Sequence, residues 1–274
     1  MKNLKKTLQN NRKLIYAFLF LISISPFFIP KKIKKPSPLN FEKFDLNLSK
    51  INSIDKAISY IEKTKSKSSK EFDTITYIQN VESFVQNRFY HGLSSYSVSE
   101  NWISHIAGKV LWNHFSAIVI PDDIMTYPEG LCSQQSIVFM EILAEKKIMT
   151  RHIGWGKKGG QGHFLVEVFY EGDWHLYDVN MEPEWENVGE KTERKSMSYF
   201  IKNKDVLYEA YRDRFTPEVF KELMTKIKFG EIDTYPAKKM RILHYSTEVF
   251  VYLIPLFLLI MLIKGFNQKL NKKN

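Results

Sequence analysis

The 274-residue sequence contains only one cysteine, Cys132. A single cysteine excludes a disulfide bond within the chain, so the cysteine count carries no information about the redox compartment. A lone cysteine is most often a small, buried, apolar side chain. A chemical role for Cys132 therefore has to be argued from the residues around it.

Acidic residues are missing from both ends of the chain. Residues 1–35 hold nine Lys and Arg and residues 264–274 hold four, with no Asp or Glu in either segment. Residues 36–263 therefore hold 27 of the 40 basic residues and all 30 acidic ones, so the net charge of +10 comes from the two tails. Such tails suit membrane headgroups. Because no basic groove or recognisable binding motif accompanies them, we expect no nucleic-acid partner.

Charge is also absent from two apolar runs. LIYAFLFLISISPFFI covers residues 14–29 and VFVYLIPLFLLIMLI covers residues 249–263. Each is slightly shorter than the about 20 residues that cross a bilayer, but flanking lysines extend the reach. The sequence predicts a transmembrane anchor over 14–30 and a transmembrane helix over 246–264, so that the membrane is a partner through two helices.

Each run has an alternative reading. The first could be a cleaved signal peptide, although Pro26 directly after Ser23-Ile24-Ser25 argues against cleavage. The second could be a buried core helix, although the basic tail that follows it favours a span. A slight bias of Lys and Arg around the runs predicts both termini in the cytoplasm and residues 31–245 outside it.

Composition divides the rest of the chain. Residues 31–70 are basic, polar and broken by proline, which favours a tether of extended backbone that holds one short helix. Residues 71–190 carry the chemistry-bearing motifs and are expected to form the catalytic domain. Residues 191–245 are mixed in charge and are expected to form a helical extension. Basic tails, 1–13 and 265–274, complete the predicted organisation.

The predicted catalytic domain is α+β. Apolar residues at helical spacing predict helices over 73–90, 99–114 and 132–147. In the second helix, Ser99 is the expected N-cap, and Trp102, Ile106 and Val110 are expected to face inwards. The apolar period then changes from 3.6 to 2, which predicts strands over 150–155, 163–170 and 174–180, the last two joined by a hairpin turn at 171–173.

Cys132 is placed at the start of the third predicted helix, directly after a turn that ends at Gly130. The unpaired N–H groups and the dipole of a helix N-terminus favour a thiolate there. The same N–H groups could stabilise an oxyanion beside the sulfur. Such a thiol is a useful nucleophile when an imidazole accepts its proton.

The predicted hairpin supplies that imidazole and a carboxylate. If Tyr170 pairs with Asp173, His163 lies opposite Asn180, with Asp178 diagonally adjacent on the same face. With a longer turn, His163 and Asp178 are direct partners. Asp178 can hold one ring nitrogen while the other serves the thiol, so we predict a Cys132 nucleophile, a His163 base and an orienting Asp178. Considered singly, His163 would be interpreted as a hydrogen-bonded strand histidine and Asp178 as an aspartate at the end of a strand.

These residues resemble the core of the transglutaminase-like superfamily. The resemblance is carried by Gly130-Leu131-Cys132 opening a helix, by the strand segment TRHIG at residues 150–154, and by HFLVEV and WHLYD at residues 163–168 and 174–178. It covers about residues 99–187 and implies a compact papain-like fold with a Cys132–His163–Asp178 triad in a membrane-anchored bacterial member. The family includes cross-linking acyltransferases, proteases and amidases, and inactive relatives.

The sequence departs from papain-like proteases before the cysteine. Thr126 stands six residues before Cys132, where those proteases often carry a glutamine that donates to the oxyanion. Tyr127, Gln135, Asn180 or the Cys132 N–H are the candidates to replace it. The glycine-rich loop 154–162 is expected to form a mobile rim of the cleft with Trp155 as a wall, or else a plain flexible loop.

Metal and cofactor chemistry find no support in the residue spacing. None of the seven histidines pairs at helical ligand spacing, and no phosphate-binding loop precedes a helix. We therefore expect thiol-dependent acyl transfer from a protein or peptide amide, without metal or cofactor. The alternatives are a cysteine protease or amidase and an inactive envelope scaffold.

Overall fold

The computed structural model describes residues 2–31, 35–65, 73–156, 162–183, 185 and 194–270. The chain forms two compact units. We call Met1–Lys34, Ser95–Ile118 and Lys239–Asn274 the helical unit, and Lys35–Ser94 and Val119–Lys238 the sheet unit. Helices and small sheets are both present, which agrees with the predicted α+β class.

The two units divide the chain differently from the predicted domains. Ser95–Ile118, expected within the catalytic domain, belongs to the helical unit. The predicted tether and most of the predicted extension belong to the sheet unit instead. The tether departs from the prediction because its helix, α2 (Ile54–Lys65), buries Ile54, Ala57 and Ile61.

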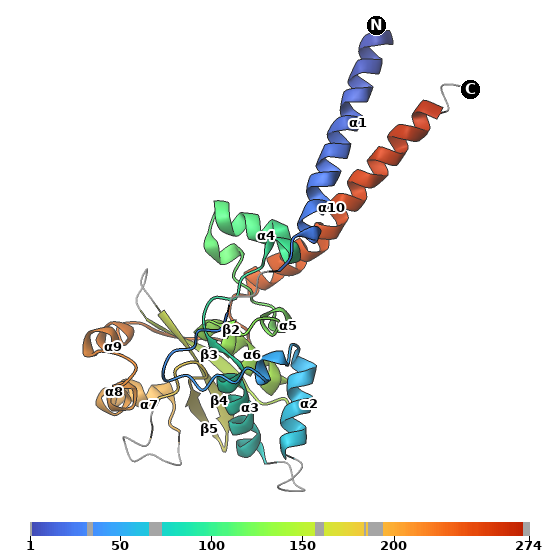
Figure 1. The fold of residues 1–274 in the computed structure, drawn as a ribbon. Helices are drawn as coiled ribbons and strands as arrows, with labels where there is room; N and C mark the ends of the chain where they lie inside the picture. The colour runs from blue at the N-terminus through green and yellow to red at the C-terminus, as the bar shows by residue number, and fades with distance from the viewer. Residues whose placement is uncertain are drawn as a thin grey trace. The chain divides into compact units, whose positions relative to one another are not determined.

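The sheet unit is built on a four-stranded antiparallel sheet (Figure 1). Its strands, in the spatial order β5-β4-β3-β6, are β5 (Asp173–Tyr177), β4 (Gly162–Tyr170), β3 (Thr150–Gly156) and β6 (Ile227–Phe229). β4 and β5 pair Tyr170 with Asp173 around a two-residue turn. Glu171 and Gly172 have φ values of 51° and 83°, the positive pair that a type I′ hairpin requires. The first of the two predicted registers is therefore confirmed, whereas β6 lies in a segment that was predicted to be helical.

Helix α6 (Cys132–Ala144) packs against β3 and β4. Its residues from Gln134 to Met140 are all buried. The ring of Phe139 lies 5.6 Å from that of Tyr177, which marks the sheet face that α6 covers. The other elements of this part are η2 (Leu48–Lys50), α3 (Thr74–Arg88), β1 (Tyr90–His91), α5 (Pro121–Ile124) and β2 (Glu129–Gly130), with β1 and β2 in a parallel pair.

The opposite sheet face is covered by the segment that was predicted to be a separate extension. Its helices are α7 (Met197–Lys202), α8 (Lys204–Tyr211) and α9 (Pro217–Leu223). Thr216 caps α9 through its side chain, and Pro217 starts the helix as predicted. One buried cluster joins these helices to the sheet: Ile153, Trp155, Leu165, Leu176, Met197, Phe200, Leu207, Tyr211, Phe220 and Leu223.

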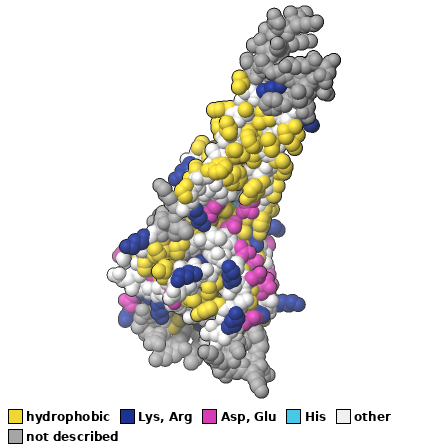
Figure 2. All heavy atoms as spheres, turned by 45° about the vertical axis from the view of Figure 1, so that its right-hand side comes forward, with side chains coloured by type: hydrophobic (Ala, Val, Ile, Leu, Met, Phe, Trp, Pro, Cys, Tyr) yellow, Lys and Arg dark blue, Asp and Glu magenta, His cyan; other side chains and the backbone are white. Residues whose placement is uncertain are grey.

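The helical unit contains two long helices, α1 (Lys2–Ile24) and α10 (Lys238–Leu270). Among the described helices, α10 over Lys238–Lys264 is the one long and apolar enough to cross a membrane. Figure 2 shows hydrophobic side chains gathered along the two long helices. The first predicted span is not shown, because α1 ends at Ile24 and a 3-10 turn, η1 (Ser25–Phe28), with Pro26 in its first turn, takes over.

The third part of the helical unit is α4 (Val98–Val110), followed by η3 (Asn113–Phe115). The N-cap of α4 is Ser97 rather than the predicted Ser99. The predicted inward face is also wrong, because Ile106 is 49% exposed and Val110 is 74% exposed. The residues that α4 buries are polar: Asn101 at 0% and Ser104 at 1% exposure.

Candidate active site

Cys132 is the first residue of α6 and is partly exposed. Leu131, just before it, has the extended backbone of an N-cap residue. The side-chain oxygen of Gln134 accepts hydrogen bonds from the N–H groups of Leu131, at 3.1 Å, and Ser94, at 3.0 Å. The start of α6 is thereby held in place, with the thiol at the end of the helix where backbone N–H groups point outwards.

Arg88 of α3 fixes the loop that leads to Cys132. Its side chain is fully buried and donates to the carbonyl groups of Ile51, Met125 and Tyr127 at 2.6–3.0 Å. Burial lowers the pKa of Arg88 to about 10, against the opposing effect of Glu129. Three carbonyl partners from two segments make this side chain a clamp on the nucleophile loop.

His163 and Asp178 form a short hydrogen bond inside the sheet unit. The Nε2 of His163 lies 2.6 Å from Oδ2 of Asp178. His163 is 6% exposed and Asp178 is 1% exposed. Because β4 and β5 pair in the register described above, both side chains lie on the sheet face that carries Leu165 and the α7–α9 cluster.

The side chain of Cys132 is close enough to the same imidazole to contribute to the raised pKa of His163. With Nε2 engaged by Asp178, Nδ1 is the ring nitrogen that remains for the sulfur. Burial works against a charged His163, but the charge and hydrogen bond of Asp178 and the hydrogen bond to Cys132 outweigh it and raise the pKa of His163 to about 10. The structure thus brings together all three residues of the predicted triad.

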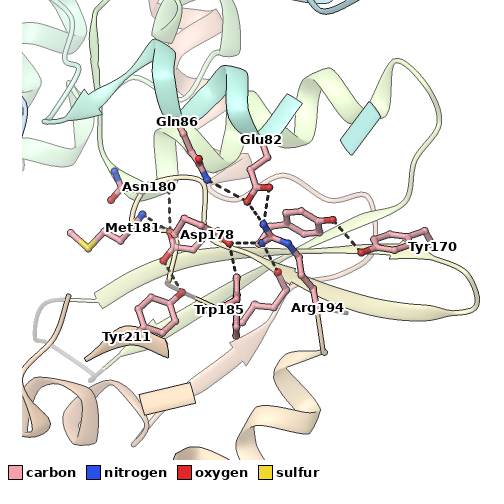
Figure 3. A network of polar contacts seen from close by, with 12 residues as sticks. Glu82, Gln86, Tyr170, Asp178, Asn180, Met181, Trp185, Arg194 and Tyr211 are labelled. Atoms are coloured by element: carbon pink, nitrogen blue, oxygen red, sulfur yellow. Dashed lines mark hydrogen bonds and ion pairs between the residues drawn. The ribbon is translucent and has the colours of Figure 1, made fainter. Parts of the chain in front are cut away.

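Asp178 accepts hydrogen bonds at both carboxylate oxygens (Figure 3). Its Oδ1 accepts from the backbone N–H groups of Asn180, at 3.1 Å, and Met181, at 2.9 Å. Its Oδ2 accepts from the hydroxyl of Tyr211 at 2.9 Å as well as from His163. Burial opposes the ionised carboxylate, but His163 and these donors together lower the pKa of Asp178. The carboxylate is therefore fixed in position and charged.

A second polar layer lies behind Asp178 (Figure 3). Glu182 accepts from the Asp178 N–H at 3.2 Å and pairs with Arg194 at 2.7 Å. Arg194 also donates to both oxygens of Glu82, at 2.7 and 2.8 Å. Burial and then the nearby Glu82 raise the pKa of Glu182, while Arg194 opposes the shift. This layer anchors the chain segment that carries Asp178.

Of the predicted oxyanion donors, Gln135 is engaged elsewhere and Tyr127 is buried. The Nε2 of Gln135 donates to the Gly130 carbonyl at 2.8 Å and so stabilises the turn before Cys132. Tyr127 is 6% exposed, and its carbonyl is held by Arg88. Thr126, in the position of the missing glutamine, bonds the Asp123 carbonyl through its hydroxyl.

The other two predicted cleft residues have different surroundings. Trp155 is 1% exposed and lies in the core, opposite His163 on β3, so it does not form the expected wall at an open rim. Residues 157–161 of the glycine-rich loop lie outside the described residues. The Oδ1 of Asn180 pairs with Nδ1 of His91 at 2.9 Å, whereas its Nδ2 is buried and has no partner among the described residues. Asn180 is thus the candidate whose donor remains available.

No protein-family model matches this sequence, and no curated protein or solved structure matches it either. Among the described residues, no group of three His, Cys, Asp or Glu side chains is placed to hold a metal ion.

Sequence reasoning missed Tyr211 and the Glu82–Glu182–Arg194 layer. Tyr211 follows Asp178 by 33 residues, and Arg194 and Glu82 are 112 residues apart, so no local period links them. One signal was present in the sequence. Trp185, Tyr199, Phe200, Tyr208, Tyr211 and Phe215 make residues 185–215 rich in aromatics, which favours a segment packed on a core over a solvated extension.

Proposed function

We propose that the chain is a membrane-anchored, transglutaminase-like enzyme that transfers acyl groups from an amide through a thioester on Cys132. The observation that carries this proposal is the buried hydrogen bond between His163 and Asp178, together with a Cys132 side chain close enough to His163 to help raise the pKa of the imidazole. A thiol, an imidazole and an orienting carboxylate in this arrangement are the parts that nucleophilic acyl transfer requires.

The reaction runs in two halves. The sulfur of Cys132, its proton held by His163, attacks the amide carbonyl carbon and forms a C–S bond, and the carbonyl electrons move to the oxygen. The imidazolium then gives its proton to the amide nitrogen, the C–N bond breaks and the amine leaves. An incoming amine attacks the thioester, His163 takes its proton, and the C–S bond breaks to regenerate the thiolate–imidazolium pair.

The oxyanion of each tetrahedral intermediate needs donors in a dry site. We assign this role to the N–H group of Cys132 at the start of α6 and to Nδ2 of Asn180. Nδ2 of Asn180 has no acceptor within the described part of the chain, which supports the assignment, because a buried donor in a folded protein normally has an acceptor. His91 fixes the orientation of the amide, because its Nδ1 donates a hydrogen bond to Oδ1 of Asn180.

The membrane location is part of the proposal. α10 is expected to span the bilayer, with the α1 segment as the second anchor and the sheet unit outside the cytoplasm. A protein or peptide amide is the expected substrate. The partial exposure of Cys132 beside a buried His163 supports approach of the substrate from the sulfur side.

The proposal is tested by trapping the acyl group. The full chain in lipid nanodiscs is incubated with a peptide library and a biotin-linked primary amine in H₂¹⁸O, with Cys132→Ala as the control. We expect acylated Cys132 by mass spectrometry and biotin on the same peptides, both absent in the control. Peptides that gain ¹⁸O but no biotin would show that the enzyme hydrolyses the amide instead of transferring the acyl group. Failure of any peptide to acylate Cys132 would contradict the proposal.

A further inference from the structure

Helix α4 and the turn after it present an exposed apolar surface in the helical unit. We define this surface as Ile106, Val110, Leu111 and Trp112. Their exposed fractions are 49%, 74%, 74% and 53%. Large exposed apolar patches mark surfaces that another phase or molecule covers.

The same helix is polar on its buried side. Asn101 and Ser104 are 0% and 1% exposed, and both hydrogen-bond the hydroxyl of Thr247 in α10, at 2.8 and 2.9 Å. A helix at a water-facing surface has the opposite arrangement, with its apolar stripe inwards. The inverted arrangement of α4 fits a helix whose outer face meets lipid.

Contacts with α10 fix the level of α4 along the membrane-spanning helix. Thr247 stands two residues before Val249, where the uncharged run of α10 begins, which is about 3 Å along a helix axis. Further contacts hold the same level: the Tyr96 hydroxyl donates to Glu248 at 2.9 Å, and His244 bonds the Phe115 carbonyl at 2.9 Å. In Figure 1, α4 lies beside the α10 segment that precedes the apolar run.

The other apolar segment, residues 14–29, ends beside the same part of α10. α4 packs against η1, and Phe27 of η1 stacks on Tyr252 of α10 with ring centres 5.5 Å apart. Lys31 pairs with Glu100 of α4 at 2.6 Å. Both apolar segments of the helical unit therefore meet α4 where they leave their uncharged stretch.

We infer that the α4 surface is inserted into the interfacial layer of the bilayer that α10 spans, as a monotopic element that holds the helical unit against the lipid. Trp112 favours this occupant, since tryptophan concentrates at the level of the headgroups. The exposed Lys109 beside the surface suits anionic headgroups. This inference rests on the membrane location in the proposed function, and it adds a third membrane contact that is not a span.

Spin-label accessibility tests separately whether α10 spans the bilayer and whether the α4 surface is inserted into its interfacial layer. Because Cys132 is the sole cysteine, Cys132→Ser gives a cysteine-free background, into which single labels are placed at Val110, Leu111, Lys239 and Phe257. The full chain is reconstituted into phosphatidylcholine–phosphatidylglycerol vesicles. The collision ratio of oxygen to a water-soluble nickel chelate then reports the depth of each label.

We expect the label at Phe257 to report the depth of the hydrocarbon core and the label at Lys239 to report water. The labels at Val110 and Leu111 should report an intermediate depth, with a ratio of oxygen to nickel collisions at least threefold higher than at Lys239. Labels at Val110 and Leu111 that match Lys239, while Phe257 remains deep, would overturn the inference and leave the anchor intact. Loss of access to both reagents with spin–spin broadening would indicate a second copy of the chain on this surface and also overturn it. A Phe257 label in water would overturn the anchor and the inference together.

Discussion

Asp178 is the residue at which the polar contacts of the sheet unit converge. It holds His163, and it is held by Tyr211 and by two backbone N–H groups. The pKa of His163 is raised from 6.5 to about 10, so its contribution to stability is complete below pH 6.5 and is lost as the pH rises towards 10. The pKa of Asp178 is lowered from 3.8, so its contribution is present above that value and is lost in acid. The pair therefore stabilises the fold most between pH 3.8 and 6.5.

The Asp178→Asn variant tests this charge coupling. The amide keeps the shape of the carboxyl group but removes its charge, so the pKa of His163 should fall from about 10 by about 1–3 units. NMR of the full chain with ¹³C-labelled histidine measures the titration, and His163→Gln assigns the resonance. A wild-type midpoint near 6.5 would show that the pair is not coupled as described.

Tyr211→Phe tests the contact that the sequence did not predict. The variant removes one hydrogen bond to a buried charge, and we expect a loss of about 1.5–3 kcal/mol in the free energy of unfolding. Because Asp178 loses a donor to its ionised form, acid unfolding should begin at a higher pH. Tyr208→Phe, on the same helix and with its ring against Phe220, is the matched control and should change stability by less than about 0.5 kcal/mol. An equal change in the free energy of unfolding for the two variants would show that the Tyr211 hydroxyl does not stabilise Asp178.

At the scale of elements, local signals in the sequence were enough to predict the hairpin and the helix that begins at Cys132. Glu171-Gly172 can adopt the turn that fixes the register, and that register sets which face His163 and Asp178 share. β6 and the packing of α7–α9 were missed because they depend on contacts with β3 far back in the chain. The outward face of α4 was misjudged because its apolar period does not say whether lipid or protein lies opposite.

Arg88→Met tests the clamp on the loop before α6. The variant keeps most of the side-chain volume but leaves three buried carbonyl groups without their donor, and we expect unfolding to become easier by about 3 kcal/mol. Denaturant unfolding of the full chain in detergent micelles measures the change. Arg212→Met, at a side chain that is 51% exposed, should be within about 0.5 kcal/mol of wild type. A near-neutral Arg88→Met would mean that the loop holds its place without the clamp.

At the scale of the whole molecule, the structure consists of a sheet unit that holds Cys132, His163 and Asp178 and a helical unit that holds α10, the helix long and apolar enough to span a membrane. The long apolar helix at α10 could be predicted from the sequence, because an uncharged run needs no long-range information to be recognised. The division into units was not predictable, because Ser95–Ile118 lies within the predicted catalytic domain in sequence but belongs to the same unit as the terminal helices in the structure.

The anchor is tested by one charge at its centre. Leu256→Arg places a cation on an exposed position in the middle of the uncharged run, at a cost of about 2.5–3.5 kcal/mol for insertion. We expect a larger share of the chain in the supernatant after alkaline carbonate extraction of membranes. Ile242→Arg, on the same helix before the run and 59% exposed, is the control and should remain in the membrane fraction like wild type. Loss of both variants from the membrane would point to unfolding rather than to failed insertion.

The central claim is that sulfur, imidazole and carboxylate act together, and the rate of Cys132 alkylation tests it most directly. Since the chain has one cysteine, every label from iodoacetamide reports this site. We predict that at pH 7 Cys132 reacts at least tenfold faster than N-acetylcysteine amide, that His163→Ala removes this advantage, and that His114→Ala, at an exposed histidine of the helical unit, leaves it unchanged. Labelling of His163→Ala at the wild-type rate would contradict the account.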